Sequence, residues 1–362
     1  MEYKQALPGN SDGDRREFLA DVSSFANAAG GYLIFGIKED AGVPSDICGL
    51  QIIDVDAAIL SLENSVRDSI TPRIPGLAVR AIPLQNQRVV IVFRIPKSWA
   101  LPHMVTFKGA SKFYSRNSAG KYQLDVGELR AAFALSETTA ERIRSFRKER
   151  LGMIVAGETP VAMGKAAKLV LHIVPIGAFD PAVGFDVASL NKHPPQPLNA
   201  VSGWSQRHNF DGHLSFNKFG NAPFVHTYLQ TFRNGIIEAV DAYILTRPGG
   251  EHIIPSIKYE QEILRAIPSF LSVQKNLGVE PPFFIMLSLL GVKGYIMGVD
   301  LSSGWSSGSP IDRDALLVPE VVVEDFNSAP TQFMRPVFDA IWNAAGWPQS
   351  RNYDDAGNWI GK

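Results

Sequence analysis

The segment SSFANAAGGYLIFGI, residues 23–37, restricts the fold of this chain more than any other stretch. Before its two glycines, apolar residues recur with the spacing of one helical face. After them, residues 32–37 form an apolar run long enough for a buried strand. Glycine tolerates left-handed backbone geometry, so Gly30 and Gly31 can end the helix and reverse the chain at once. The sequence therefore predicts a helix joined to a central strand with almost no loop.

Two helix starts are marked by capping residues. We expect a helix at residues 14–29 with Asp14 as N-cap and Glu17 as its capping-box partner. Asp125, with Glu128 three residues later, predicts the start of another helix. The other elements expected in this half are helices at 55–70 and 138–150, strands at 77–82 and 89–95, and a strand entering a turn in KFYSRNSAGKYQL.

The second half predicts another α+β domain without a motif that indicates chemistry. Asn234-Gly235 is a strong hairpin signal between two apolar runs within residues 224–245. An amphipathic helix is expected at 256–278, followed by buried strands in PFFIMLSLLGVKGYIMGV and a closing helix interrupted at Pro336. The fold class expected for the whole chain is thus α+β.

Length and composition favour two domains. A chain of 362 residues with 45% hydrophobic residues can bury two ordinary cores. The segment 151–165 is rich in Gly, Ala and Pro, and we expect it to link a domain at 1–150 to a domain at 166–362.

The sequence lacks the signals of a membrane or secreted protein. No apolar run approaches the roughly 18 residues that span a bilayer, and the N-terminus does not resemble a signal peptide. Cys48 is the single cysteine, which excludes an internal disulfide and favours a reducing compartment. We therefore expect a cytoplasmic protein with no membrane partner.

The charges are distributed unevenly although the net charge is −1. No acidic residue lies between Asp68 and Asp125. That interval carries many cations, namely Arg73, Arg80, Arg88, Arg94, Lys97, Lys108, Lys112, Arg116 and Lys121. Aromatic residues are interleaved with them, the mixture that a nucleic acid would use for its phosphates and bases. The alternative is a sheet with inward aromatics and solvated cations.

The order of three motifs resembles a known family. EYK near the N-terminus, FANAAGGYLIFGI and FYSRNSAG followed by LDVGEL are similar to the Schlafen AlbA-like domain. The resemblance covers about the first 135 residues. It implies an α+β fold, a link to nucleic acid and, in animal members, metal-dependent endonuclease activity on transfer and ribosomal RNA. Bacterial members, which this chain resembles, are described as transcriptional regulators or ATP-binding proteins.

The resemblance also implies site residues. Glu2 matches the acid of the family's E-aromatic-K motif, and Glu39 or Asp40 matches the acid that follows the strand after the double glycine. These three are the expected catalytic residues and ligands of Mg²⁺ or Mn²⁺. The family carries a further carboxylate about five residues before the E-aromatic-K motif, and it has no counterpart here because the sequence begins at Met1. Three explanations remain open. The start codon is assigned too late, the site is built with two acids, or the protein has lost the activity.

The expected phosphate contacts are Lys4 beside the metal, together with Arg94, Lys112, Arg116 and Lys121. We expect no nucleotide cofactor, because no G-x-x-x-x-G-K-[ST] is present and a strand, not a helix, follows the glycines. Two functions are therefore predicted. The first is a metal-dependent endoribonuclease acting on structured RNA such as transfer RNA, and the alternative is a non-catalytic DNA- or RNA-binding or regulatory protein. RNA is favoured over DNA as the partner, and a homodimer is the assembly considered.

Overall fold

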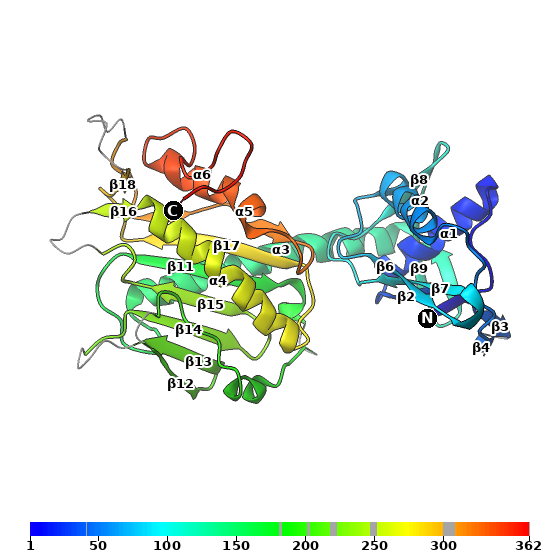
Figure 1. Ribbon diagram of the computed structural model, residues 1–362, viewed down its shortest axis with the longest axis horizontal. Coiled ribbons are helices and arrows are strands. Elements are labelled where there is room, and N and C mark those ends of the chain that lie inside the picture. Colours follow the sequence, from blue (N-terminus) through cyan, green and yellow to red (C-terminus); the bar gives the residue numbers. More distant parts are fainter. Residues whose placement is uncertain are drawn as a thin grey trace. The chain divides into compact units, whose positions relative to one another are not determined.

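The computed structural model describes residues 1–40, 42–180, 183–200, 203–217, 223–246, 252–299 and 308–361. The chain forms two compact units, Met1–Glu141 and Arg142–Lys362 (Figure 1). Each unit combines helices with β-sheet, which confirms the predicted α+β class.

Two sheets and a hairpin build the N-terminal unit. The first sheet has the order β1 (Glu2–Lys4), β2 (Gly31–Phe35), β7 (Val89–Ile95) and β6 (Ala78–Pro83). Strand β1 runs parallel to β2, and the other neighbours are antiparallel. The second sheet has the order β10 (Gly120–Gln123), β9 (Ala110–Asn117), β8 (Met104–Phe107) and β5 (Ile70–Thr71), and β3 (Lys38–Asp40) pairs with β4 (Val43–Asp46). As predicted, β2 lies inside its sheet.

Two helices, α1 (Asp12–Ala26) and α2 (Val55–Ser69), contribute to the core of this unit. They pack with the buried residues that alternate along β2 and β7, among them Leu33, Phe35, Ile91 and Phe93. The rings of Phe18, Phe35 and Phe93 meet at centroid distances of 5.5–6.1 Å. The apolar stripe of α1 is therefore the reason why this helix covers the sheet.

Gly30 and Gly31 form the predicted turn, and close packing is a second reason why both positions are glycine. Gly30 has a φ of +75° and Gly31 a φ of +150°. A Cβ on Gly30 would lie 2.5 Å from the backbone nitrogen of Lys97, and one on Gly31 would lie 2.7 Å from the Phe25 ring. Glycine is thus required here both for backbone geometry and for close approach.

The start of α1 corrects the predicted cap. Ser11 is the N-cap, and its hydroxyl accepts a hydrogen bond from the Asp14 backbone nitrogen at 3.1 Å. The Ser11 hydroxyl also donates to the Asp14 carboxylate at 2.6 Å. Asp14 is therefore the third residue of the first turn, because the serine hydroxyl three positions earlier already satisfies its backbone donor.

Helix α3 (Val126–Ala156) is longer than expected. Its start follows the prediction, since the Asp125 side chain accepts from the Glu128 backbone at 2.8 Å and Glu128 accepts from the Asp125 backbone at 2.9 Å. The two predicted helices form one continuous helix. That helix runs into the first residues of the expected linker at 151–165, because the buried Leu151 and Ile154 pack in the C-terminal unit.

An eight-stranded sheet organises the C-terminal unit. Its order is β12 (Ser205–His208), β13 (Gly212–Asn217), β14 (Thr227–Phe232), β15 (Ile237–Asp241), β11 (Lys168–Pro175), β17 (Phe283–Leu290) and β19 (Ala315–Leu317), with β20 (Val321–Val323) also on β17. Asn234-Gly235 joins β14 to β15, as predicted. A separate pair is formed by β16 (Ile253–Pro255) and β18 (Ile296–Gly298), and short 3-10 turns lie at Gln85–Gln87, Ile176–Phe179 and Val187–Asn191.

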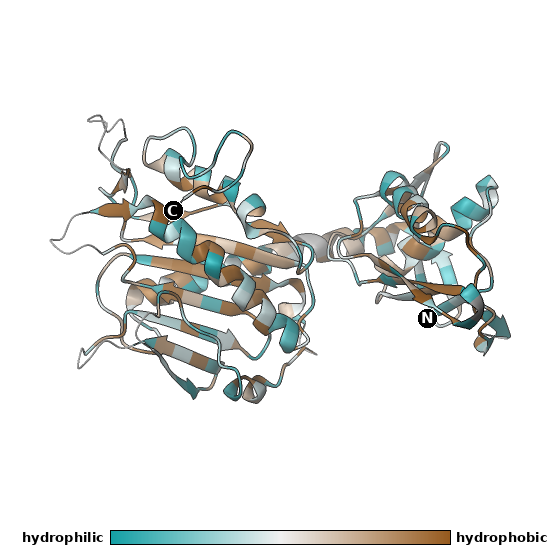
Figure 2. Cartoon of the chain, in the orientation of Figure 1, coloured by the Kyte–Doolittle hydropathy of each residue, from teal (hydrophilic) through white to brown (hydrophobic). Residues whose placement is uncertain are grey.

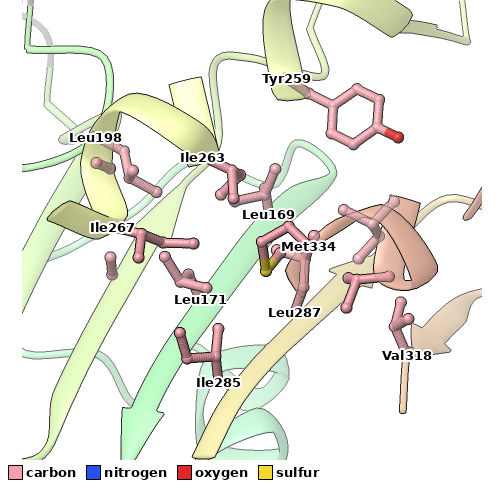
Figure 3. Packing of buried hydrophobic residues seen from close by; sticks show 14 of the residues in the cluster. Leu169, Leu171, Leu198, Tyr259, Ile263, Ile267, Ile285, Leu287, Val318 and Met334 are labelled. Atoms are coloured by element: carbon pink, nitrogen blue, oxygen red, sulfur yellow. The ribbon is translucent and has the colours of Figure 1, made fainter. Parts of the chain in front are cut away.

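Helices α4 (Ser256–Asn276), α5 (Pro330–Phe333) and α6 (Arg335–Ala344) contribute to the main core of this unit. Figure 3 shows how Ile263 and Ile267 of α4 meet Leu169 and Leu171 of β11. Figure 2 shows hydrophobic residues along the central strands and hydrophilic residues on α4. The closing helix is interrupted, as predicted, but at Met334 and not at Pro336, which lies in the first turn of α6.

Candidate nucleic-acid interface

Three of the predicted phosphate-binding cations come together in the N-terminal unit. Lys4 lies on the edge strand β1, Arg116 on β9 and Lys121 on β10. The antiparallel pairing of β9 with β10 places Lys121 directly opposite Arg116. Lys4 joins them through shared acidic partners. The fold thus collects cations from positions more than 100 residues apart.

Three carboxylates lie between these cations. The Glu2 carboxylate is 2.8 Å from Lys4 Nζ and 2.8 Å from Arg116 Nη2. The Asp21 carboxylate is 3.3 Å from Lys4 Nζ and 2.6 Å from Lys121 Nζ. Glu17 contacts Lys121 as well. We call the six residues Glu2, Lys4, Glu17, Asp21, Arg116 and Lys121 the charged cluster.

Asp21 is the member that the sequence analysis missed. It lies on α1 among buried apolar residues and is itself only 1% exposed. The signal available in the sequence was a lone acid next to Val22 on the face that also carries Phe18 and Phe25. A buried acid needs ionic or hydrogen-bonding partners, so such an acid indicates that cations lie opposite.

The environment shifts two carboxyl pKa values in opposite directions. Burial opposes the ionisation of Glu2, but hydrogen bonds from Lys4 and Arg116 bring its pKa below the ordinary value. Burial raises the pKa of Asp21 above the ordinary value, and the hydrogen bond from Lys121 acts against this. Of these two carboxylates, Asp21 is thus the one whose charge the fold stabilises less.

Arg116 is fixed on two sides. Its guanidinium carbon lies 3.6 Å from the centroid of the Phe25 ring, and its Nη2 bonds to Glu2. A cation over an aromatic face is attracted by the ring quadrupole. Arg116 is therefore a positioned cation.

The other predicted contacts lie outside the charged cluster. Lys112 is exposed on β9, and Arg94 lies on β7, turned away from the buried Phe93 and Ile95. Glu39 and Asp40 are exposed on the hairpin strand β3.

A divalent metal does not fit the cluster as its side chains lie. No group of three or more His, Cys, Asp or Glu residues within the described ranges is placed to hold a metal ion. Glu2 is already held by Lys4 and Arg116, and Asp21 by Lys4 and Lys121. The set Glu2, Glu39 and Asp40 therefore remains a prediction for the ligands of a metal.

Fold and cluster together define the N-terminal unit as a small α+β domain with a polyionic surface site. Its residues 1–125 match the family model described as Schlafen, AlbA_2, so this unit is a Schlafen AlbA-like domain. This family assignment suggests a nucleic-acid-related function for the domain.

The crystal structure of the DIP2311 protein from Corynebacterium diphtheriae is similar to part of the chain, at 17% identity and a TM-score of 0.25. The match covers 34% of this chain and 24% of that one. No curated protein matches the chain. None of the helices in the described ranges combines the length and apolar character that crossing a bilayer requires.

Proposed function

We propose that the protein binds RNA through the cations of its N-terminal domain. The observation that carries this proposal is the convergence of Lys4, Arg116 and Lys121 from three strands on one surface. The absence of acids between Asp68 and Asp125 and the family assignment support it. Lys112 and Arg94, which lie outside the charged cluster, are the further cations that would contact the RNA backbone. Structured RNA such as transfer RNA is the proposed ligand, in preference to DNA.

The internal carboxylates would compete with the phosphates of the RNA. The Glu17 side chain is 59% exposed, whereas that of Asp21 is 2% exposed. A phosphate can therefore replace Glu17 as the partner of Lys121, because the Glu17 carboxylate is already exposed to solvent and stays so when the pair breaks. Lys121 would keep its contact with Asp21 and exchange Glu17 for the phosphate.

A metal-dependent endoribonuclease is the second candidate. One observation favours it: Lys4 Nζ lies within 2.8 Å of Glu2 and 3.3 Å of Asp21, so two carboxylates already share one cation. Hydrolysis of a phosphodiester with Mg²⁺ or Mn²⁺ calls for carboxylates that hold the metal, and here the Lys4 ammonium group lies between these two carboxylates. We place binding first because the described acids do not form a three-ligand group.

We expect the variant Lys112→Ala/Lys121→Ala to bind labelled transfer RNA about 10-fold more weakly than the wild type. Each phosphate contact removed also lowers the slope of log K against log salt by about 0.7 to 0.9. Gel-shift titrations at several salt concentrations measure both quantities. The matched control is Lys108→Ala, which removes an exposed cation paired with Asp12 elsewhere in the same unit.

The same gel separates the two candidate functions. Fragments that appear with Mn²⁺, disappear with EDTA and are lost in Glu2→Ala/Glu39→Ala/Asp40→Ala would establish the nuclease. A shifted and uncleaved band under both conditions would support the binding protein. If neither a shift nor fragments appear with the wild-type chain, the proposed function is wrong for this RNA.

Glu17→Gln should bind RNA more tightly than the wild type, by about 2- to 5-fold at low salt. The substitution removes the exposed competitor for Lys121 and leaves the buried Asp21 in place. Exposed ion pairs contribute little to stability, so the melting temperature should stay within a few degrees. Fluorescence anisotropy at two salt concentrations measures the gain, which should shrink as salt rises. Unchanged or weaker binding would show that Lys121 does not contact phosphate.

A further inference from the structure

The sheet β1-β2-β7-β6 has one face in the core and a second face with exposed side chains. Leu33, Phe35, Ile91 and Phe93 point to the core and are at most 3% exposed. Because side chains alternate along a strand, the residues between them turn to the other side. This outer face carries Tyr3, Tyr32, Ile34, Ala78, Arg80, Ile82, Val90, Val92 and Arg94, of which Val90 is buried and the other eight are partly or fully exposed.

The strand register arranges the outer face in rows. In one row Tyr32 stands beside Arg94, which stands beside Ala78. In the next row Tyr3 stands beside Ile34, and that row continues across the sheet to Arg80. Directly paired residues in a sheet have Cβ atoms about 5 Å apart. Each row thus combines a tyrosine with an arginine.

The outer face is suited to a ligand that is both flat and anionic. Tyr32 is 41% exposed and Ile82 is 50% exposed, so an aromatic ring and aliphatic surface are accessible. Its charged residues are Arg80 and Arg94, and none of its nine residues is acidic. Unpaired bases stack on tyrosine rings and on guanidinium planes, while their phosphates are attracted by the positive charge.

The edge strand β1 connects this face to the charged cluster. Lys4 belongs to the cluster, and its neighbour Tyr3 belongs to the outer face. Successive residues of one strand therefore offer a phosphate contact and a stacking surface on opposite sides of the sheet. A flexible RNA strand that crosses β1 would reach both, whereas the bases of a duplex are already stacked on one another.

We infer that the outer face of this sheet stacks unpaired bases, which makes single-stranded segments of RNA the preferred ligand. This inference rests on the proposed function and specifies which part of an RNA the domain reads. Tyr32 is the main stacking residue, because it is the more exposed of the two tyrosines.

The test uses the full-length chain and a 12-nucleotide single-stranded RNA that contains one 2-aminopurine, compared with the same sequence in a blunt duplex. We expect the single strand to bind at least 10-fold more tightly and the 2-aminopurine fluorescence to be quenched on binding. Tyr32→Ala should weaken single-strand binding by about 5- to 100-fold, the range for loss of one base–aromatic stack. Tyr32→Phe should retain the affinity, and the salt slope should not change in either variant.

The matched control is Tyr243→Ala, which removes a tyrosine of similar exposure, 42%, from the other unit. If Tyr32→Ala binds like the wild type while Lys112→Ala/Lys121→Ala is weak, the inference is wrong and the proposed function stands. If the wild type binds transfer RNA but not the single strand, the inference is wrong and the proposed function stands; if it binds none of these RNAs, both are wrong. Sedimentation velocity adds one more outcome: a dimer that dissociates in Tyr32→Ala without change in RNA affinity would assign the face to a second copy of the chain and overturn the inference.

Discussion

Replacing Glu238 by alanine should lower the free energy of unfolding of the C-terminal unit by about 3 to 5 kcal/mol, the range for removing one partner of a buried ion pair. Glu238 is fully buried on β15, and Arg150 of α3 holds its carboxylate through two hydrogen bonds of 2.8 Å. His172 and Tyr228 contact the same carboxylate at 3.0 and 2.9 Å. Without it, the guanidinium of Arg150 remains largely buried without its anion.

Denaturant titration of the full-length chain measures this loss. The control is Glu320→Ala, which breaks the pair with Arg144 on the same helix. The Arg144 side chain is 60% exposed, so its pair should contribute less than about 1 kcal/mol. Equal losses of stability in Glu238→Ala and Glu320→Ala would contradict the role of Glu238 as the buried carboxylate that holds Arg150 of α3.

The pH dependence of stability gives an independent check on Glu238. Burial would raise its pKa, but hydrogen bonds from Arg150 and His172 lower it from 4.5 to about 2. A carboxyl group whose pKa is lower in the folded state stabilises the fold above its unfolded pKa. The contribution is therefore present above pH 4.5 and is lost as pH falls toward 2. The free energy of unfolding of the variant Glu238→Gln should not show this decrease between pH 4.5 and pH 2.

Glu260→Ala should destabilise the C-terminal unit by about 3 kcal/mol or more, because several buried donors lose their acceptor at once. Glu260 is fully buried on α4 and accepts hydrogen bonds from Trp342 Nε1 at 2.8 Å, Ser350 Oγ at 2.8 Å and Trp359 Nε1 at 2.9 Å. Three side chains of the C-terminal segment thus donate hydrogen bonds to one carboxylate.

The tryptophan donors provide a specific measurement for Glu260. The emission of Trp342 and Trp359 should shift to the red in Glu260→Ala, and hydrogen exchange near Ser350 should accelerate. Glu260→Gln should lose less stability, because one amide oxygen still accepts while the amide nitrogen faces a donor. The control is Arg265→Ala on the same helix, which removes an exposed partner of Glu262. A result for Glu260→Ala as small as this control would contradict the role assigned here.

The local elements of this protein could be predicted from its sequence, because their causes lie within a few residues. The Gly30-Gly31 turn, the Asp125–Glu128 cap and the Asn234-Gly235 hairpin are all present. The error at the start of α1 had the same local scale, since Ser11 and Asp14 are both good capping residues and geometry selects the earlier one.

The composition of the candidate site could be predicted only in part. The basic interval and the family resemblance led to Lys4, Arg116 and Lys121, which the fold brings together. They did not lead to Asp21, whose signal in the sequence is only that of an acid on the apolar face of α1, because its partners Lys4 and Lys121 lie on distant strands.

The sequence by itself therefore determined the α+β class, the helix–glycine–strand turn and the family of the N-terminal domain. Only the tertiary structure decided which charges meet. Lys121 reaches Asp21 across 100 positions of sequence because β10 and α1 pack in the same unit. It also decided that Tyr3 and Lys4 serve opposite faces of one sheet. Turns and helix caps depend on residues that are close in sequence. The charged side chains, in contrast, meet only when distant strands and helices pack together and bury the carboxylates that need them.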